Sequence, residues 1–373
     1  MFTIQQTRGR ARRGVLEVNH GRIETPFFMP IATQGAVKTL SSEDMKDLGA
    51  QILLSNTYHL LLRPGREGIK QLGGLQTFMH WDGPLLTDSG GYQVFSLAKL
   101  NQIQENGVSF QSHIDGQKIT LTPSGSMAMQ SAIGADIVMQ FDDVAAGNSS
   151  KERYSEAMER SLRWAKECKD THDPKQKLFG IVQGGTFEDL REKSAEGLMQ
   201  IGFDGYAIGG LSVGEPRSSA FHIAKEVASL LPGDQPRYFM GGGMPEEIVY
   251  YVSVGVDMFD CVLPTRNARH GTLFLWNDDP SIVVPQAFAL AQNGADDQLI
   301  AETLYTKVQI TKESFSFDRS PIDPFADHSS QIYSKAYLRH LLKTQEMLGS
   351  RLASMQNISF YLRLMKELRN VLS

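Results

Sequence analysis

The sequence predicts a (β/α)8 barrel, an α/β fold, from two observations that recur along the chain. Short apolar runs alternate with helical patterns over most of the 373 residues, and this alternation is typical of a parallel sheet with helices outside it. Each run also ends at a polar residue or a glycine, and in a barrel the ends of all strands surround one cavity. An open, doubly wound sheet is the lesser alternative, because no G-x-G-x-x-G signature follows the early strands.

Composition limits the classes of function. Hydrophobic residues make up 41% of the chain, which allows a large core. The net charge of −5 means that any binding of nucleic acid depends on local basic patches. Cys168 and Cys261 are the only cysteines, so a disulfide framework and a cysteine-rich zinc site are excluded. No stretch resembles a signal peptide or reaches membrane-spanning length, and we therefore expect a soluble cytoplasmic protein.

The first predicted element is a hairpin. Residues 14–30 alternate in hydropathy and turn at 19–21, so we expect a hairpin packed outside the main sheet that closes one end of it. The strands of the barrel follow as seven apolar runs, at residues 52–55, 84–87, 135–141, 178–182, 206–208, 238–240 and 258–259. Helical patterns lie between them, for example at 152–168 and 218–231.

Polar side chains converge at the predicted strand ends. The residues at or just beyond these ends are Asp88, Asp142, Gln183, Gly210, Met240 and Asp260. Three carboxylates at one barrel mouth repel one another, and without a ligand this arrangement costs stability. We therefore interpret the set as a functional site rather than as unrelated caps and turns.

One stretch combines a carboxylate with basic residues. The apolar run before Asp260 ends there, and Arg266 and Arg269 follow within ten positions. This places a possible nucleophile next to groups that bind phosphate or base edges. Taken alone, the stretch fits better with an aspartate that caps the next helix and two solvated arginines. The other strand ends reverse that preference.

The pattern changes after Gly271. We expect a strand, a mostly polar helical stretch, a loop-like region and two final helices, at residues 272–276, 287–307, 308–330, 331–347 and 349–371. Lys335, Arg339 and Lys343 recur every four residues and form a basic stripe, which suits a solvated face as well as a phosphate-binding one. The predicted domains are residues 1–310, the barrel with its hairpin, and 311–373, a C-terminal helical subdomain.

Five motifs, in order, resemble the tRNA-guanine transglycosylase family, also called queuine tRNA-ribosyltransferases. They are Asp88-Ser-Gly-Gly-Tyr92-Gln, Phe141-Asp142-Asp143, Val182-Gln183-Gly-Gly, Gly209-Gly210-Leu-Ser-Val-Gly-Glu215 and the stretch 257–269. The likeness covers nearly all of residues 1–271 and returns in the last two helices. It implies an irregular (β/α)8 TIM barrel. It also implies an enzyme that exchanges guanine at the wobble position of tRNAs with G-U-N anticodons for a 7-deazaguanine base.

The resemblance also implies roles for single residues. Asp260 is expected to attack C1′ of the ribose as nucleophile, and Asp88 to act as general acid and base. Two displacements through a covalent ester retain the configuration at C1′, and no redox cofactor or catalytic metal is needed. The expected base pocket comprises Ser89, Gly90, Gly91, Tyr92, Asp142, Gln183, Gly209, Gly210, Leu211 and Met240.

Within that pocket, Asp142, Gln183 and the backbone at Gly210 are expected to read the base edge, while Tyr92 and Met240 sandwich the ring. Aromatic and thioether walls favour a base that has left its stack. The expected RNA contacts lie in two loops and comprise Gly241, Gly242, Gly243, Met244, Pro245, Glu246, Glu247, Thr265, Arg266, Asn267, Ala268 and Arg269.

The sequence departs from the family at a structural zinc site. The family carries a Cys-x-Cys-x-x-Cys run and a later histidine, whereas this chain has Phe325, Asp327, Ser330 and Gln356 at those positions. We therefore expect no zinc and no other cofactor, with apolar packing and hydrogen bonds in its place. A rebuilt site from Asp323, Asp327 and His328 is the minor alternative. The stretch 287–307 reads as an insertion without an assigned function.

The base pocket also differs from that of typical bacterial family members. Asp143-Val144 stands where typical bacterial members have Glu-Cys and resembles eukaryotic members that use queuine, although Val213 follows the bacterial pattern. We lean to queuine over the aminomethyl precursor preQ1. The expected partners are tRNA, the free 7-deazaguanine base and a second copy of the chain, with Tyr333, Tyr337 and His340 near the dimer contact and no membrane involved.

Two rival functions remain. A non-catalytic RNA-binding subunit of a transglycosylase complex is disfavoured because Asp260 and Asp88 are both present. A barrel glycoside hydrolase with two carboxylates fits poorly with the glycine-rich loop at 209–210 and the basic loop at 265–269.

Overall fold

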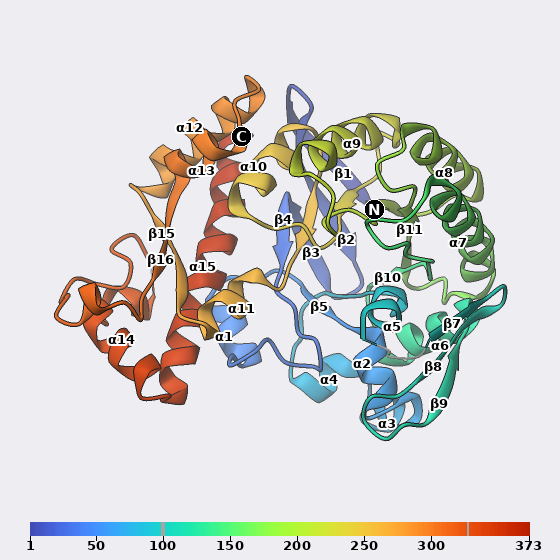
Figure 1. Ribbon diagram of the computed structural model, residues 1–373, viewed down its shortest axis with the longest axis horizontal. Coiled ribbons are helices and arrows are strands. Elements are labelled where there is room, and N and C mark those ends of the chain that lie inside the picture. Colours follow the sequence, from blue (N-terminus) through green and yellow to red (C-terminus); the bar gives the residue numbers. More distant parts are fainter. Residues whose placement is uncertain (98–100, 327) are drawn as a thin grey trace.

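The protein is a closed parallel barrel with a C-terminal lobe, and the computed structural model describes residues 1–97, 101–326 and 328–373 (Figure 1). Eight strands form one parallel sheet in the order β4-β14-β13-β12-β11-β10-β6-β5. They are β4 (Phe27–Met29), β5 (Leu53–Ser55), β6 (Leu85–Thr87), β10 (Ile137–Met139), β11 (Lys177–Val182), β12 (Gly205–Ile208), β13 (Arg237–Phe239) and β14 (Met258–Asp260). The predicted fold class is confirmed.

The barrel closes just beyond its first strand. The Leu54 N–H donates to the Pro30 carbonyl at 3.0 Å, and the Ala32 N–H donates to the Leu54 carbonyl at 2.6 Å. Residues 27–30 therefore begin the barrel, whereas the sequence predicts them as the end of a hairpin. The reason is local, because only Pro26 separates β4 from β3 (Gly21–Thr25), so the two strands look like one alternating run.

A three-stranded antiparallel sheet closes the barrel at the amino ends of its strands. It consists of β1 (Phe2–Arg8), which is not among the predicted elements, β2 (Ala11–Val18) and β3. Leu16 and Ile23 belong to the same buried apolar cluster as the residues inside the barrel. The backbone N–H of His20 donates to the carboxylate of Asp136, just before β10, at 2.9 Å. The opposite end, where the strands finish, is thus the open one.

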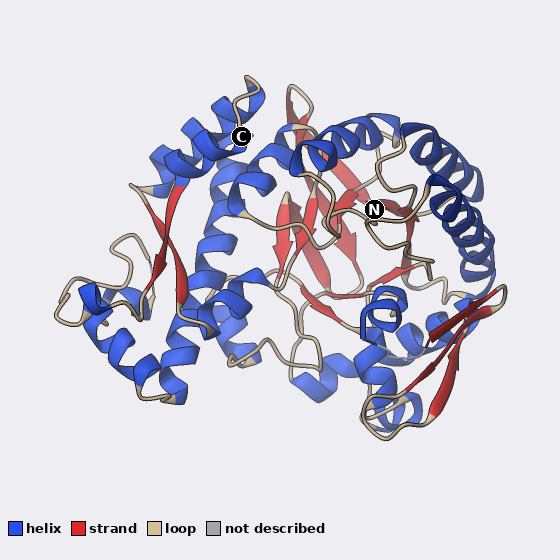
Figure 2. Cartoon of the chain, viewed as in Figure 1, coloured by secondary structure: helices blue, strands red, loops and turns tan. Residues whose placement is uncertain are grey.

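Helices surround the barrel (Figure 2). They are α1 (Ser42–Asp47), α2 (Thr57–Leu62), α3 (Arg66–Gln71), α4 (Leu75–Met79), α5 (Gly91–Leu97), α6 (Pro123–Ile133), α7 (Lys151–Thr171), α8 (Glu188–Ile201), α9 (Arg217–Leu230) and α10 (Pro245–Ser253). α7 begins where the Ser150 hydroxyl accepts the Arg153 N–H, and its apolar side chains recur every three or four positions to face the sheet. The helices predicted at 152–168 and 218–231 are confirmed.

An additional antiparallel sheet interrupts the barrel between α5 and α6. It is formed by β7 (Asn101–Gln104), β8 (Gly107–Gln111) and β9 (Lys118–Leu121), none of which is among the predicted elements. Val108, Ser109 and Phe110 of the middle strand are all buried, so side chains on both faces of this strand are covered. In Figure 1 this sheet lies at the edge of the molecule beside α7.

The C-terminal lobe begins after the last barrel strand. It contains α11 (Leu263–Arg269), β15 (Thr272–Trp276), α12 (Pro280–Gln292), α13 (Asp297–Leu304), β16 (Tyr305–Gln309), short 3-10 helices at Glu313–Phe315 and Ser329–Gln331, α14 (Lys335–Lys343) and α15 (Met347–Val371). The predicted strand at 272–276 is confirmed. The stretch 287–307 is instead the end of a helix with one buried face, a second helix and part of a strand that pairs with β15. No described helix has both the length and the apolar composition that a bilayer crossing requires.

The lobe is tied to the barrel by polar contacts. Arg217, at the start of α9, pairs with Glu247 at 2.9 Å and also with Glu246 and with Asp297 on α13. The Tyr305 hydroxyl donates to the buried Glu246 carboxylate at 2.9 Å. The stretch 287–307, predicted as an insertion, thus contacts and stabilises the start of α10. The loop before α10 contains Gly241, which lines the cavity described below.

Candidate active site

A cavity of about 400 Å³ opens at the carboxyl ends of the barrel strands. This volume is within the range of small-molecule sites. The predicted site residues that line it are Asp88, Ser89, Tyr92, Asp142, Gln183, Gly209, Gly210, Leu211, Met240, Gly241 and Asp260. The structure therefore brings residues from six strand ends to one place. Gly91 supports the wall from behind, because a Cβ there would meet the Asp142 carbonyl at 2.7 Å.

Asp260 ends β14 and is held on one oxygen. Its Oδ1 accepts the Tyr238 hydroxyl at 2.6 Å and the Gly241 N–H at 2.8 Å. Burial raises the pKa of Asp260, and these two donors oppose the rise because they stabilise the ionised carboxylate. Since Tyr238 points inward from the neighbouring strand, the carboxylate is fixed in direction. None of the described residues donates a hydrogen bond to its other oxygen, which is thus available for a reacting atom.

Asp88 follows β6 and sits in a different environment. It accepts the Thr57 N–H on Oδ1 at 2.8 Å and the Asn56 amide on Oδ2, both from the start of α2. Burial raises the pKa of Asp88 to about 7, with a smaller contribution from the charge of Asp260. A carboxyl group with a pKa near neutrality can both donate and accept a proton at working pH. Asp88 is thus suited to proton transfer, whereas Asp260 is held as an oriented carboxylate.

Asp142 follows β10 and faces the cavity from the other side. Its Oδ2 accepts the Gln183 amide at 2.7 Å, and its Oδ1 lies 3.2 Å from the Ser89 hydroxyl that donates to it. Burial raises the pKa of Asp142 to about 6, so the group is mostly ionised at neutral pH. An ionised carboxylate offers about four acceptor positions. Asp142 therefore keeps capacity for two N–H donors of a bound ligand.

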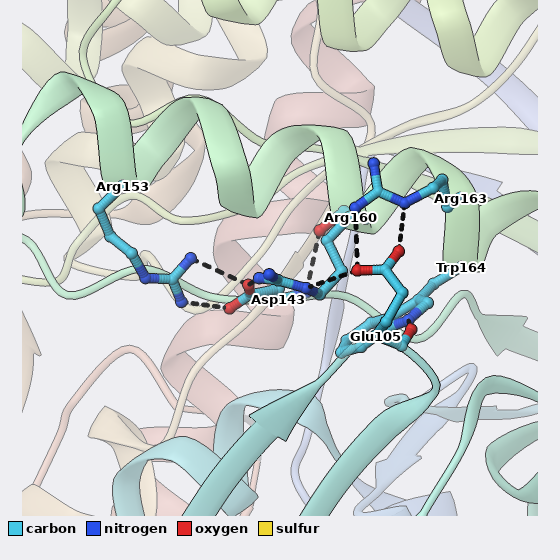
Figure 3. Close-up of polar contacts among 7 residues, drawn as sticks. Glu105, Asp143, Arg153, Arg160, Arg163 and Trp164 are labelled. Atoms are coloured by element: carbon cyan, nitrogen blue, oxygen red, sulfur yellow. Dashed lines mark hydrogen bonds and ion pairs between the residues drawn. The ribbon is translucent and has the colours of Figure 1, made fainter.

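The next residue, Asp143, turns away from the cavity and is bound by two arginines of α7. Arg153 contacts both of its oxygens, at 2.6 and 2.9 Å, and Arg160 contacts one at 2.5 Å (Figure 3). Arg160 also pairs with Glu105, at the β7–β8 turn, at 3.6 Å, and Glu105 in turn accepts hydrogen bonds from Arg163. The network fixes the loop that presents Asp142, and it joins the additional antiparallel sheet to α7.

The ring-stacking candidates stand at the cavity wall. The Tyr92 side chain lines the cavity and is 48% exposed, so its ring is accessible to a flat ligand. Met240 is half-buried after β13 and packs against the apolar cluster inside the barrel. Val144 and Val213 also line the cavity.

The predicted RNA-contact residues divide by exposure. Arg266 and Arg269 lie exposed on α11, and Gly241 is exposed at the cavity edge; Met244, Glu247 and Asn267 are half-buried. The others are buried, namely Gly242, Gly243, Pro245, Glu246, Thr265 and Ala268. Both predicted loops continue into helices, since α10 begins at Pro245 and α11 covers Thr265 to Arg269.

The buried members of this set support the exposed ones. The Tyr361 hydroxyl of α15 donates to the Gly243 carbonyl at 2.6 Å. Asn357 of the same helix donates to the Pro264 carbonyl at 3.0 Å. Helix α15 therefore orients both the loop beside Asp260 and the helix that carries Arg266.

The positions of the family zinc ligands do not fit a zinc ion. Gln356 is buried and its amide donates to Asp323 at 2.7 Å and to the Phe274 carbonyl at 3.2 Å. The Asp323 carboxylate also accepts the Phe325 N–H at 2.9 Å, and the Phe325 side chain has no donor atom for a metal. Structural zinc needs thiolate or imidazole ligands in tetrahedral array. The described residues contain no cluster of three or more metal-binding side chains, and Asp327 lies outside those residues.

Three residues that hold the cavity-lining groups in place are not predicted from the sequence. Tyr238 reads as core because it lies within an apolar run, and Asn56 stands between two apolar segments. Arg191 reads as a surface residue of a polar helix, yet it is 1% exposed behind the cavity. For Asn56 a signal was available, because it directly follows β5 just as Asp88 follows β6.

Comparisons with known proteins agree on one family. The family model described as queuine tRNA-ribosyltransferase matches residues 7–373. A protein of that name from Pelotomaculum thermopropionicum is 47% identical over 361 residues, covering 96% of this chain and 90% of the relative. One from Idiomarina loihiensis is 47% identical over 373 residues, covering 100% and 92%. One from Fusobacterium nucleatum is 46% identical over 376 residues, covering 100% and 93%.

Proposed function

The chain belongs to the queuine tRNA-ribosyltransferase family of tRNA-guanine transglycosylases, and on that premise we propose a double displacement in which Asp260 is the nucleophile and Asp88 moves the proton. The observation that carries this proposal is the contrast between the two carboxylates at one cavity. Asp260 is fixed on one oxygen by Tyr238 and Gly241. Asp88 has a pKa of about 7 through burial.

The two steps balance in atoms and protons. An oxygen of Asp260 attacks C1′ of the wobble ribose, the bond from C1′ to N9 of guanine breaks, and protonated Asp88 donates its proton to the leaving base. The incoming base then gives its N9 proton to Asp88 and attacks C1′, which breaks the ester to Asp260. Each displacement inverts C1′, so the product retains the original configuration.

Recognition of the base follows from the opposite wall. Asp142 accepts the two N–H donors of a guanine-type edge, Gln183 orients Asp142, and the Gly210 backbone contacts the remaining edge. A ligand without these donors leaves a buried carboxylate unpaired, which costs far more than a lost surface contact. Tyr92 and Met240 cover the two faces of the ring.

The base that enters is queuine in our proposal, rather than preQ1. Val144 lines the cavity and is 6% exposed, and its apolar side chain offers no polar partner to the substituent at position 7. Such a wall favours the bulkier, partly apolar group of queuine, although Val213 narrows the same region. Competition of both free bases in the guanine-exchange assay decides between them, and stronger inhibition by preQ1 would reverse the assignment.

The tRNA is bound by a surface next to the cavity. Arg266 and Arg269 offer two exposed cations beside Asp260, and phosphate contacts of this kind position RNA without reading sequence. The buried residues of the two predicted segments hold this surface in place. Each arginine that contacts a phosphate should contribute close to one unit to the slope of log affinity against log salt.

We place the enzyme in the cytoplasm, without zinc or another cofactor, with the Asp323–Gln356 pair in place of the zinc site. We propose a catalytic domain of residues 1–310, which includes the first part of the C-terminal lobe, and a subdomain of residues 311–373 whose helix α15 returns to the barrel. Metal analysis of the purified protein tests the zinc-free state. One zinc ion per chain would contradict it.

The oligomer is a homodimer formed through the C-terminal lobe. Tyr333 and Tyr337 stack with ring centroids 5.5 Å apart, and Tyr337 is 39% exposed. Ile332 and Met347 are 80% and 89% exposed, which leaves apolar side chains on this lobe in contact with water. Light scattering of the wild type and of Tyr337→Asp tests the contact, since a dimeric variant would exclude it.

Incorporation of labelled guanine into tRNA tests the function as a whole. A transglycosylase replaces the base and keeps the ribose chain intact. A non-catalytic RNA-binding subunit binds the same tRNA without incorporation, and a glycoside hydrolase releases a base or sugar without replacing it. Wild-type protein that binds tRNA and incorporates no guanine would refute the proposal.

A further inference from the structure

Arg191 on α8 is a buried cation whose hydrogen bonds, in the part of the chain that the structure describes, all go to backbone carbonyls. Its side chain is 1% exposed, and the Nη2 atom has no hydrogen-bond partner among the described residues. Burial lowers the pKa of Arg191 to about 9, so the side chain is still cationic at neutral pH. Burying a cation without a bonded carboxylate is costly, and the nearby charge of Glu215 offsets only part of that cost. The placement therefore calls for a role that a neutral side chain cannot fill.

The bonds of Arg191 go to two adjacent barrel strands, just where the base-reading residues begin. Nη1 donates to the Val182 carbonyl and to the Gly209 carbonyl, both at 2.7 Å, and Nε donates to the Gly185 carbonyl at 2.8 Å. Val182 precedes Gln183 in the chain, and Gly209 precedes Gly210. The guanidinium thus lies behind both strand ends, on the side away from the cavity.

The peptide between Gly209 and Gly210 connects the cation to the cavity. In a trans peptide the C=O and N–H bonds point in opposite directions. Because Arg191 holds the carbonyl from behind, the Gly210 N–H is directed away from Arg191. Gly210 lines the cavity, and no backbone acceptor in the described part of the chain bonds its N–H. A Cβ at this glycine would meet Gln183 Oε1 at 2.3 Å, so the bare backbone forms the wall.

We propose that Arg191 is a positioning residue that fixes and polarises the Gly209–Gly210 peptide, so that the Gly210 N–H stabilises negative charge on the 6-oxygen of the leaving purine. The inference rests on the proposed function, because it needs a guanine-type base with its 6-oxygen at Gly210. When the bond from N9 to C1′ breaks, its electron pair enters the purine ring and part of the charge reaches this oxygen. Arg191 itself neither gains nor loses a proton.

The physical reason is preorganisation. A hydrogen-bond donor that already points to the site of developing charge stabilises the transition state without reorganising. A cation bonded to the far end of the same peptide strengthens that donor, since polarisation passes along a chain of hydrogen bonds. A neutral residue at 191 fills the space and leaves the donor weaker.

The test compares guanine with 6-thioguanine, which keeps the N–H donors that Asp142 accepts and replaces the 6-oxygen by sulfur, a weaker acceptor. The variants are Arg191→Met and Arg191→Lys in the full-length chain. Arg237→Met is the matched control, because Arg237 donates to the Leu231 carbonyl at 2.8 Å at the other end of the barrel. The readouts are calorimetric binding of each free base and kcat for guanine exchange into tRNA.

We expect Arg191→Met to lower kcat by roughly 10- to 100-fold, as partial loss of an oxyanion donor does. Its binding of guanine should weaken more than its binding of 6-thioguanine, so that the preference for guanine over 6-thioguanine becomes smaller. The preference of Arg191→Lys should lie between those of the wild type and Arg191→Met. Arg237→Met should leave the preference unchanged.

If Arg191→Met weakens the binding of both bases by the same factor, the preference for the oxygen is unchanged. That result would show that Arg191 only holds the loops and would overturn the inference. If Arg191→Met does not fold, the same ratio measured on Arg191→Lys decides the matter. Wild-type protein that exchanges no guanine would refute the proposed function instead, and the ratio of binding constants would still report on Arg191.

Discussion

Replacing Tyr238 by phenylalanine should shift the pH dependence of catalysis by a predictable amount. The Tyr238 hydroxyl donates to Asp260 at 2.6 Å and is one of two donors on that oxygen. The ring is 1% exposed and packs in the apolar cluster inside the barrel, so phenylalanine keeps the packing. The change removes one charge-assisted hydrogen bond and little else.

The size of the expected pKa shift follows from the free energy that this hydrogen bond contributes. A hydrogen bond to an ionised group contributes about 1.5–3 kcal/mol, and one pKa unit corresponds to about 1.36 kcal/mol. Loss of the donor disfavours the ionised form, so the pKa of Asp260 should rise by about one to two units. Because Asp260 attacks only when ionised, the acid limb of the profile should move to higher pH by the same amount.

The assay is kcat/KM for guanine exchange as a function of pH. At acid pH, Tyr238→Phe should be about 10- to 100-fold slower than wild type, and the two should converge at alkaline pH. Tyr206→Phe is the matched control, because Tyr206 is also a buried tyrosine, on the adjacent strand β12, and belongs to the other apolar cluster, outside the barrel interior. An acid limb that stays in place in Tyr238→Phe, or moves equally in both variants, would refute the assignment of Asp260 as the ionised nucleophile.

Three further predictions concern other parts of the site and the lobe. Asp142→Asn should raise KM for the free base at least about tenfold, since it loses an ionised acceptor, and should abolish the weakening of wild-type base binding below about pH 6; a KM equal to wild type would contradict the base-reading role. Asp88→Asn should bind the base normally and exchange it roughly 10²–10⁴-fold more slowly in steady-state assays, and a wild-type rate would remove Asp88 from the proton transfer. Gln356→Leu should lower the free energy of unfolding by about 1–3 kcal/mol, because Asp323 loses a buried donor, while a zinc chelator leaves the wild-type denaturation midpoint unchanged; a chelator-sensitive midpoint would indicate a metal.

The barrel is predictable from the sequence because its strands are short, apolar and followed by polar residues. That pattern locates seven strands correctly and indicates, for six of them, the end that carries the site. The eighth, β4, escapes because a single proline separates it from the preceding strand, and hydropathy alone cannot show a change of sheet. The family resemblance adds residue roles that no periodicity contains.

The supporting residues are harder to predict, for one physical reason. Local sequence shows what a side chain is, but not which neighbour it meets across strands. Tyr238 resembles any other core aromatic until β13 is placed next to β14. Arg191 belongs to a polar helix, and only the packing of α8 on the sheet shows that its guanidinium is enclosed. Asp323 and Gln356, far apart in sequence, pair only once α15 returns past the lobe.

The most direct test of the central claim is to locate the covalent bond between enzyme and RNA. Protein incubated with its tRNA without a second base should form an adduct that survives denaturation. Digestion and mass spectrometry should then place a ribose ester on Asp260, and Asp260→Ala should fold normally and form none. An adduct on Asp88, or one that persists in Asp260→Ala, would contradict the account.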